Sequence, residues 1–286
     1  MTTMLHDTSS PESGMFAEFG ELIEGKLWIN LQNGSLYAQE PAIELTFPML
    51  AVRHGQTDSN IANIWQGQID GPTNQLNAVG KEQARLAAIN LYDHFQGLFG
   101  DHLLRIALAG RLVILSSPLG RAKDTANAFR EYFSRQTEIL LPLRIEPDLA
   151  EIFFGDVEGQ SLETLNDELR RCLLEFKKGR DAAIDWNGTG ESFSDVVLRG
   201  ARLLERLEEQ YGGTETIVVA FSHGTCINAL RVALGDALLI EPDGRVAFRK
   251  HLTDNGEPYW LGESYEYALR LAKRVAQQSP LLASPN

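Results

Sequence analysis

The sequence is poor in cysteine and contains no long apolar run. Its 286 residues include only two cysteines, Cys172 and Cys226, which excludes a disulfide framework and favours a reducing compartment. No apolar segment approaches the roughly 20 residues that a membrane-spanning helix needs. The polar N-terminal stretch MTTMLHDTSSPESG lacks the apolar centre of a secretory signal. We therefore expect a soluble, cytoplasmic protein with no membrane partner.

Basic residues are also scarce. The chain has 26 Lys and Arg against 39 Asp and Glu, which gives a formal net charge of −13. A protein this acidic is not expected to bind nucleic acid or anionic membranes through its overall charge. Any anion site must therefore be a local basic pocket. Because 43% of the residues are hydrophobic, the chain has ample material for the core of one large domain.

Short β-branched runs alternate with helical patterns along most of the chain. The runs at 44–52, 111–117 and 215–222 are predicted to be buried strands, the first starting near Met49 because Pro48 precedes it. Helical patterns begin near Asn77, Pro118, Ser161, Ser192, Thr225 and Ser264. This alternation predicts an α/β fold, a three-layer sandwich with a mostly parallel central sheet flanked by helices.

The N-terminal part of the chain differs from the rest. Residues 1–14 are rich in Ser, Thr, Pro and Gly and are predicted to be disordered. Asn33 and Gly34 separate two partly alternating runs, which indicates a β-hairpin with a two-residue turn. We therefore divide the chain into an N-terminal extension, residues 1–45, and one α/β domain, residues 46–286.

Basic side chains stand at or just past the ends of all three predicted strands. Arg53 and His54 follow the first strand, Arg121 follows the second and His223 follows the third. Ligands of open α/β sheets bind beyond the carboxyl ends of the strands. The pattern thus predicts a common site, the alternative being ordinary loops in which these side chains reach solvent.

Two arginines and a histidine suit a phosphate group. Arginines bind a dianionic phosphate through bidentate, charge-assisted hydrogen bonds, and a neutral histidine is a nucleophile at phosphorus. A second histidine, if protonated, would stabilise charge on the phosphoryl oxygens. Gly55 would let the backbone approach the ligand closely. Thr57, Asp58 or Ser59 would cap a following helix, whose amides add to an anion site.

The same chemistry needs a carboxylic acid to protonate the leaving oxygen. The segment AEIFFGDVEGQ (Ala150–Gln160) offers three candidates, Glu151, Asp156 and Glu158. No segment resembles a metal-ligand cluster, so neither a metal nor another cofactor is expected.

Several segments, in this order, resemble the motifs of the histidine phosphatase superfamily, which has the phosphoglycerate mutase-like fold. The similarity extends from about Met49 to Leu234 and has Val157 where the family usually has Trp. The segments are RHGQTDSN (53–60), WQGQIDGPTNQLNAVGKEQA (65–84), SSPLGRAKDTA (116–126), EIFFGDVEG (151–159), GESFSDV (190–196) and VVAFSHGTCI (218–227).

The resemblance implies a phosphoric monoester hydrolase of the histidine acid phosphatase type, acting on a small phosphorylated metabolite without a metal. His54 would be the phosphorylated nucleophile, and Glu151 would be the proton donor and later the base toward water. The remaining implied residues would bind or flank the phosphoryl group: Arg53, Arg121, His223, Asn60, Gln66, Gly67 and Gly224. For Asn60 and Gln66, a simple turn or capping role is the alternative.

Three alternatives concern the activity. Phosphoglycerate mutases usually carry basic and phenolic residues where this chain has Ile152, Phe153 and Phe154, so hydrolysis is favoured over mutase-type phosphotransfer. An inactive binding module is the third interpretation.

Lys177, Lys178 and Arg180 indicate either a solvated helix end or a lid over the substrate. Substrate specificity is expected in the loops at 73–76, 152–154 and 177–192.

Other phosphatase chemistries fail on spacing. Only four residues separate Cys226 from Arg231, whereas cysteine phosphatases need five. The stretch AVGKE lacks both the upstream glycine and the Ser or Thr of a phosphate-binding loop. The substrate and the presence of a homo-oligomer stay open.

Overall fold

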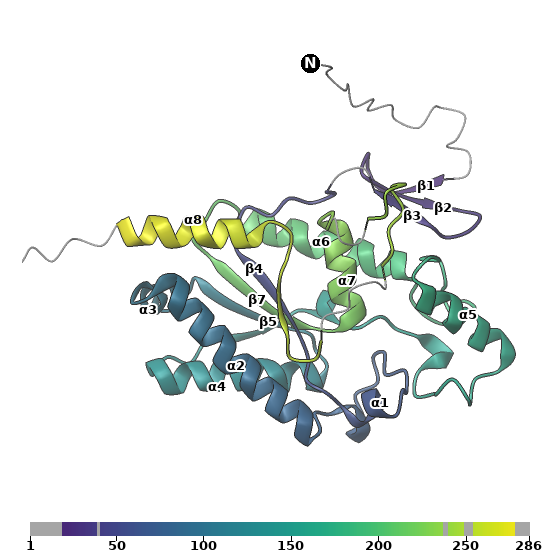
Figure 1. The fold of residues 1–286 in the computed structure, drawn as a ribbon, viewed down its shortest axis with the longest axis horizontal. Helices are drawn as coiled ribbons and strands as arrows, with labels where there is room; N and C mark the ends of the chain where they lie inside the picture. The colour runs from purple at the N-terminus through teal and green to yellow at the C-terminus, as the bar shows by residue number, and fades with distance from the viewer. Residues whose placement is uncertain (1–18, 39–40, 237–239, 249–253, 278–286) are drawn as a thin grey trace, which may run out of the picture.

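A five-stranded sheet forms the centre of the molecule (Figure 1) in a computed structural model that describes residues 19–38, 41–236, 240–248 and 254–277. The strand order is β6-β5-β7-β4-β8. The strands are β4 (Met49–Arg53), β5 (Leu112–Ser116), β6 (Leu143–Ile145), β7 (Ile217–Ser222) and β8 (Pro258–Trp260). All neighbours are parallel except β8, which runs antiparallel to β4. The predicted mostly parallel sheet is confirmed, and β8 is an addition to it.

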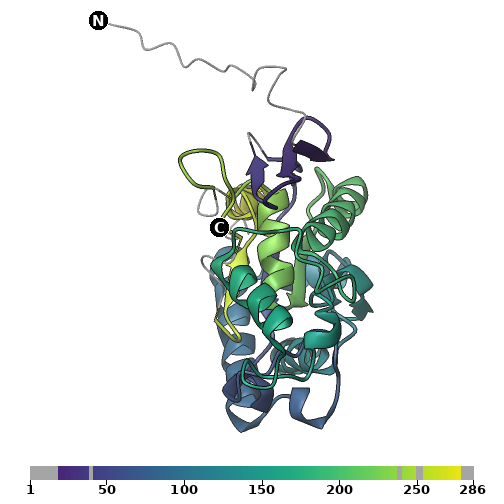
Figure 2. The same cartoon turned by 90° about the vertical axis from the view of Figure 1, so that its right-hand side faces the viewer.

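Successive residues of β4 point into two different cores, as the twofold periodicity of a strand requires. Met49 and Ala51 belong to one core, and Leu50 and Val52 to the other. The second core is covered by α2 (Ala78–Phe99), α3 (His102–Leu108), α4 (Gly120–Thr137) and α8 (Ser264–Gln277). The first is covered by α5 (Asp167–Lys178), α6 (Phe193–Tyr211) and α7 (Gly224–Ala233). Figures 1 and 2 show the resulting three layers, which confirm the predicted sandwich.

The N-terminal strands form a separate three-stranded antiparallel sheet, β1 (Phe19–Ile23), β2 (Leu27–Asn30) and β3 (Leu36–Ala38). The predicted hairpin is confirmed, but its two-residue turn is wrong. Asn30 donates its N–H to the Ser35 carbonyl (2.8 Å), so four residues make the turn. The Asn30 side chain explains the longer loop, because its Oδ1 accepts the amides of Gln32 and Asn33.

The small sheet packs on the main body. Leu27, Ile29 and Leu36 are buried in the same core as Met49 and Ala51. The division at residue 45 stays a prediction, and the expected disorder of residues 1–14 lies outside the described residues.

Helix starts differ from the sequence patterns where side chains cap the backbone. The helix expected from Ser161 begins at Asp167, because Asn166 accepts the Leu169 amide. The helix expected from Pro118 begins at Gly120, whose amide donates to the Asp70 carboxylate (2.9 Å). In both places a hydrogen bond that the hydrophobic pattern does not reveal accompanies the boundary, a local one at Asn166 and a long-range one at Gly120.

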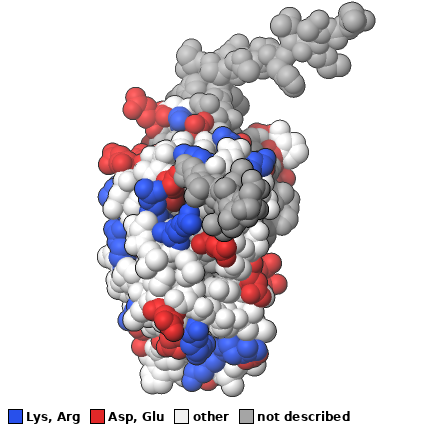
Figure 3. Space-filling view, turned by 90° about the vertical axis from the view of Figure 1, so that its left-hand side faces the viewer, with Lys and Arg blue, Asp and Glu red and all other residues white. Residues whose placement is uncertain are grey.

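Charges of both signs are interspersed on the face opposite the one shown in Figure 2, so the acidic excess forms no single patch in that view (Figure 3). Within the described residues, no helix is both long and apolar enough to cross a membrane.

Candidate active site

The parallel pairing of β4 and β7 brings two histidines side by side. Arg53 is in register with Ser222, the last residues of their strands. His54 and His223 follow directly, and their ring centroids lie 5.0 Å apart. His54 also donates its backbone N–H to the Ser222 carbonyl (3.0 Å). The structure therefore brings His54 and His223 together at the carboxyl ends of β4 and β7, as the sequence predicted.

His54 is buried, with 3% of its surface exposed. Its Nδ1 lies 2.7 Å from the Gly55 carbonyl, which can only accept, so Nδ1 carries the proton and Nε2 is left with a lone pair. Burial, together with the charges of Arg121 and Arg53, holds the pKa of His54 well below its usual value. The ring is therefore neutral, with a nucleophilic nitrogen at Nε2.

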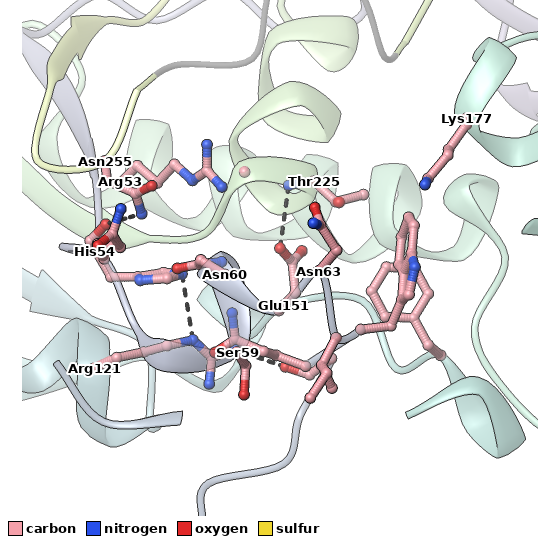
Figure 4. Close-up of a pocket in the computed structure, with 17 residues that line it drawn as sticks. Arg53, His54, Ser59, Asn60, Asn63, Arg121, Glu151, Lys177, Thr225 and Asn255 are labelled. Carbon is pink, nitrogen blue, oxygen red and sulfur yellow. Dashed lines mark hydrogen bonds between the residues drawn. The ribbon is translucent and has the colours of Figure 1, made fainter. Parts of the chain in front are cut away.

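Arg121, in the first turn of α4, faces that nitrogen. Its Nε donates to His54 Nε2 (3.3 Å), as Figure 4 shows. Its two remaining nitrogens donate to the carbonyls of Ile69 (3.1 Å) and Gly67 (2.7 Å). Burial lowers the pKa of Arg121 to about 10, and nearby carboxylates such as Glu151 oppose this shift. The guanidinium is thus a fixed positive charge beside His54.

His223 is fully buried, and its Nε2 lies 2.8 Å from Ser117 Oγ. Its Nδ1 has no hydrogen-bond partner among the described residues. Burial is the largest cause that holds the pKa of His223 well below its usual value, with the charge of Arg121 second. The protonated second histidine considered from the sequence is therefore not the form that this site favours without a ligand.

Glu151 lines the same pocket, between Lys177 on one side and His54 and Arg121 on the other (Figure 4). Its Oε1 accepts the amides of Ile152 (2.9 Å) and Cys226 (3.2 Å), and its Oε2 accepts the Thr225 amide (3.3 Å). The N-terminus of α7 therefore orients the carboxylate.

The two rival carboxylates are placed elsewhere. Asp156 is exposed and does not line the pocket. Glu158 Oε1 accepts the amides of Gln68 (2.7 Å) and Phe154 (3.0 Å), which ties two loops together. Burial raises the pKa of Glu158. Of the three candidates, only Glu151 lines the pocket.

Four further predicted residues line this pocket: Asn60, Gln66, Gly67 and Gly224. The capping alternative for Asn60 is present, because its Oδ1 accepts from Thr57, the N-cap of α1 (Asp58–Ile61). Gln66 Oε1 accepts the Thr57 hydroxyl (2.9 Å). Both amide oxygens are thus used structurally, while neither amide nitrogen has a hydrogen bond with the described residues.

Gly55 has a packing role that the sequence did not reveal. A Cβ on Gly55 would lie 2.2 Å from the Gly80 carbonyl oxygen, and a Cβ on Gly80 would lie 2.0 Å from that of Gln56. These two glycines therefore let the loop after β4 pack against the first turn of α2. The close approach that the sequence suggested is to another backbone segment.

Sequence reasoning missed two groups around the site. Asn255 lines the pocket and donates to the His54 carbonyl (2.7 Å), but it lies after β7, beyond the matched motifs. Arg199 lies buried in α6 and donates to the carbonyls of Asp148, Ala150 and Glu151. An arginine on the apolar face of an amphipathic helix pattern was the available sequence signal for Arg199.

Beyond the basic groups around His54, the pocket is lined by a mixture of polar, aromatic and charged residues. The pocket has a volume of about 410 Å³, and its outer residues include Asn63, Trp65, Phe154 and Lys177. Of the three apolar residues after Glu151, only Phe154 lines it, because Ile152 is fully buried in the core and Phe153 is largely exposed. The loop at 73–76 does not reach the pocket.

No group of three or more His, Cys, Asp or Glu side chains arranged to hold a metal occurs in the described part of the chain. The absence of a metal cofactor stays a prediction.

Comparisons with known proteins identify the family of this chain. Residues 49–244 match the histidine phosphatase superfamily (branch 1). Glucosyl-3-phosphoglycerate phosphatase of Mycobacterium tuberculosis is 31% identical over 192 residues, which cover 65% of this chain and 74% of that protein. Mannitol-1-phosphatase of Eimeria tenella is 33% identical over 150 residues, half of this chain but only 43% of that relative.

A solved structure of mycobacterial glucosyl-3-phosphoglycerate phosphatase with VO3 has a similar fold. The two structures have a TM-score of 0.52 and are 30% identical, over 74% of this chain and 89% of the other. This likeness confirms the predicted phosphoglycerate mutase-like fold.

Proposed function

This chain belongs to the histidine phosphatase superfamily (branch 1), and from that membership we propose that it hydrolyses a small phosphomonoester through a phosphohistidine on His54. The observation that carries the proposal is the neutral His54, whose Nε2 faces the Arg121 guanidinium in a pocket lined also by Glu151. A nucleophile, a cation and an acid are the groups that phosphoryl transfer through a phosphohistidine requires, and their presence in one pocket supports the proposal.

In the first step, His54 Nε2 attacks phosphorus and the bond to the leaving oxygen breaks. Glu151 donates its proton to that oxygen, and Oε2 is the oxygen suited to carry it because it accepts only the Thr225 amide. In the second step, Glu151 takes a proton from water while the hydroxide attacks phosphorus and the nitrogen–phosphorus bond breaks. Free phosphate is released, and neutral His54 and protonated Glu151 are restored.

Arg53 and Arg121 neutralise the phosphoryl oxygens, so that this mechanism needs no metal ion. His223 contributes as a neutral donor. Ser117 Oγ accepts the Leu119 amide (3.3 Å), and we infer that its hydroxyl donates to His223 Nε2 (2.8 Å), so that the single N–H of the neutral ring is at Nδ1. That buried N–H has no other partner among the described residues and would bind a phosphoryl oxygen.

The test is hydrolysis of p-nitrophenyl phosphate in the presence of a chelator by the wild type, His54→Ala and, as a control, His102→Ala on α3. We expect full wild-type and control activity and a loss of about 10⁴-fold or more in kcat/KM for His54→Ala. Mass spectrometry after a basic quench should find phosphate on His54. An active His54→Ala variant, or complete loss with chelator, would overturn the mechanism.

Mutase-type phosphotransfer is the second candidate and is separated by its product. Incubation with 3-phosphoglycerate should release free phosphate if water is the acceptor and yield 2-phosphoglycerate if the enzyme is a mutase. The inactive binding module predicts no turnover of any phosphomonoester. The cytoplasmic location and any homo-oligomer stay predictions.

A further inference from the structure

The pocket is larger than one phosphate group requires. Its inner end holds His54, Arg53 and Arg121, and its volume of about 410 Å³ extends outward to Lys177. Figure 4 shows Lys177 across the pocket from His54 and Arg121, with Glu151 and Asn63 between them. The proton donor thus lies between two positively charged ends.

Lys177 is held at the mouth of the pocket by its neighbour in α5. Phe176 is fully buried, and its ring packs against those of Trp186 (5.0 Å between centroids) and Phe154 (5.8 Å). Gly179 ends the helix in a left-handed conformation. The backbone of Lys177 is therefore fixed by the aromatic core, while its side chain is exposed.

The ammonium group of Lys177 has no counter-charge of its own in the described part of the chain. It lies 5.4 Å from the centroid of the Trp65 ring and forms no ion pair there, and Glu163 interacts with it only at longer range. Lys178, the next residue, is paired with Glu175 (2.5 Å) and does not line this pocket. Lys177 therefore lines the pocket without an ion pair, whereas Lys178 has an ion pair and does not line the pocket.

The charged side chains that line the pocket favour a substrate with more than one anionic group. When Glu151 holds the proton for the leaving oxygen, the lining carries three cations and no anion. A phosphate dianion would bind between Arg53 and Arg121, which leaves Lys177 as the further cation of this lining.

The middle of the pocket offers polar contacts for the part of the substrate that would join the two ends. Asn63 adopts a left-handed backbone (φ 52°), and its side-chain amide forms no hydrogen bond with the described residues. Trp65 contributes an aromatic ring beside it. Amide groups bind hydroxyls, and aromatic rings pack on the C–H faces of sugars and polyols.

We propose that Lys177 binds a second anionic group on the leaving group of the substrate. The substrate class is a phosphomonoester whose leaving group has a hydroxylated chain or ring ending in a carboxylate or a second phosphate. This inference rests on the proposed phosphatase function and adds a specificity residue to the same pocket. It replaces the solvated helix end as the interpretation of Lys177, and it leaves that interpretation in place for Lys178.

The test uses substrates that differ in the distal charge. The carboxylate arm compares 6-phosphogluconate with glucose 6-phosphate, and the phosphate arm compares fructose 1,6-bisphosphate with fructose 6-phosphate. The readout is the ratio of kcat/KM for the charged over the uncharged substrate. The variants are Lys177→Gln, Lys177→Arg and the matched control Lys178→Gln, which removes the same charge from the same helical turn.

We expect the wild type to prefer the charged member of at least one pair and Lys177→Gln to reduce that ratio roughly fivefold, as for an exposed ion pair. Lys177→Arg should retain most of it, and added salt should lower the wild-type ratio. The arm that responds identifies the distal group as carboxylate or phosphate.

Other results overturn the inference. A wild type without preference in either pair, a Lys177→Gln ratio equal to the wild type, or an equal loss in Lys178→Gln would each do so. Hydrolysis of p-nitrophenyl phosphate and inhibition by inorganic phosphate report on the catalytic end alone. If the wild type hydrolyses no phosphomonoester, the proposed function fails and this inference fails with it.

Discussion

Arg199 and Glu191 form a partly buried ion pair next to the segment that carries the proton donor, with Arg199 Nε 3.0 Å from Glu191 Oε1. Arg199 also holds the carbonyls of Asp148 (2.6 Å) and Ala150 (2.9 Å), and Glu191 Oε2 accepts the Phe153 amide (2.9 Å). The pair thus fixes the backbone on both sides of Glu151 without lining the pocket itself. We infer that Arg199 is a positioning residue.

Arg199→Lys should therefore lower kcat through Glu151. A lysine keeps the charge but cannot direct as many hydrogen bonds, so Glu151 loses its fixed position, and we expect a kcat loss of about 10- to 10²-fold. The inhibition constant of inorganic phosphate should change little, since the groups around His54 are untouched. Steady-state kinetics with phosphate inhibition measure both. If kcat falls and the inhibition constant of phosphate rises by a similar factor, Arg199 has only a structural role.

Arg121→Lys tests the phosphate end of the pocket. The guanidinium spans His54 Nε2 and two carbonyls of the loop after Gln66, which one ammonium group cannot do. We expect kcat/KM for p-nitrophenyl phosphate to fall by about 10²- to 10³-fold and phosphate inhibition to weaken. Lys123→Arg on the same helix is the control. Retained phosphate inhibition in Arg121→Lys would contradict this role.

The two buried histidines make stability depend on pH. Burial keeps the pKa values of His54 and His223 well below the ordinary 6.5, so below that pH the unfolded chain binds more protons than the folded one. Stability is therefore complete above about pH 6.5 and is lost as the pH falls, by up to about 1.4 kcal/mol per pH unit for each histidine.

His223→Asn should reduce this loss, because one of the two groups no longer titrates. Urea unfolding of both proteins between about pH 7.5 and pH 5.5, without phosphate, gives the two slopes. Equal slopes would show that His223 is protonated in the folded state.

Gly67→Ala should disturb the site through Glu158. Gly67 has φ 47°, and a Cβ there would lie 1.8 Å from Glu158 Oε1, so this carboxylate must give up its bonds to Gln68 and Phe154. Gly110 has φ 68° and open space within 4 Å of where a Cβ would lie, so Gly110→Ala measures the backbone strain alone. We expect Gly67→Ala to cost at least about 1 kcal/mol more in unfolding free energy and to lower activity. An equal loss of unfolding free energy in Gly67→Ala and Gly110→Ala would show that the Glu158 side chain moves away from the new Cβ at no cost.

The strands and the basic residues at their ends could be predicted because both depend on local sequence. β5 and β7 are continuous apolar runs, and the residues that follow them must reach the same sheet edge. The choice among Glu151, Asp156 and Glu158 could not be made that way. It depends on the amides of Thr225 and Cys226, some 75 residues along the chain, which orient Glu151.

Errors and omissions arose where the structure depends on contacts that the sequence pattern does not reveal. The Asn33-Gly34 pair predicted a short turn, but the Asn30 side chain lengthened it. Gly55 was expected to approach the ligand, and its packing against Gly80 was missed because Gly80 lies in another motif. Asn255 reaches His54 from β8's side of the sheet, a pairing that no local pattern of residues near position 255 indicates.

The register of β4 against β7, with Arg53 beside Ser222, has a consequence for how this protein acquires activity. A slip of one residue would turn His54 toward the opposite layer and bury Arg53 in the core. Misaligned molecules would then be compact but inert. The activity recovered after refolding would therefore measure the fraction of chains with the correct register. Helix content alone does not report this fraction.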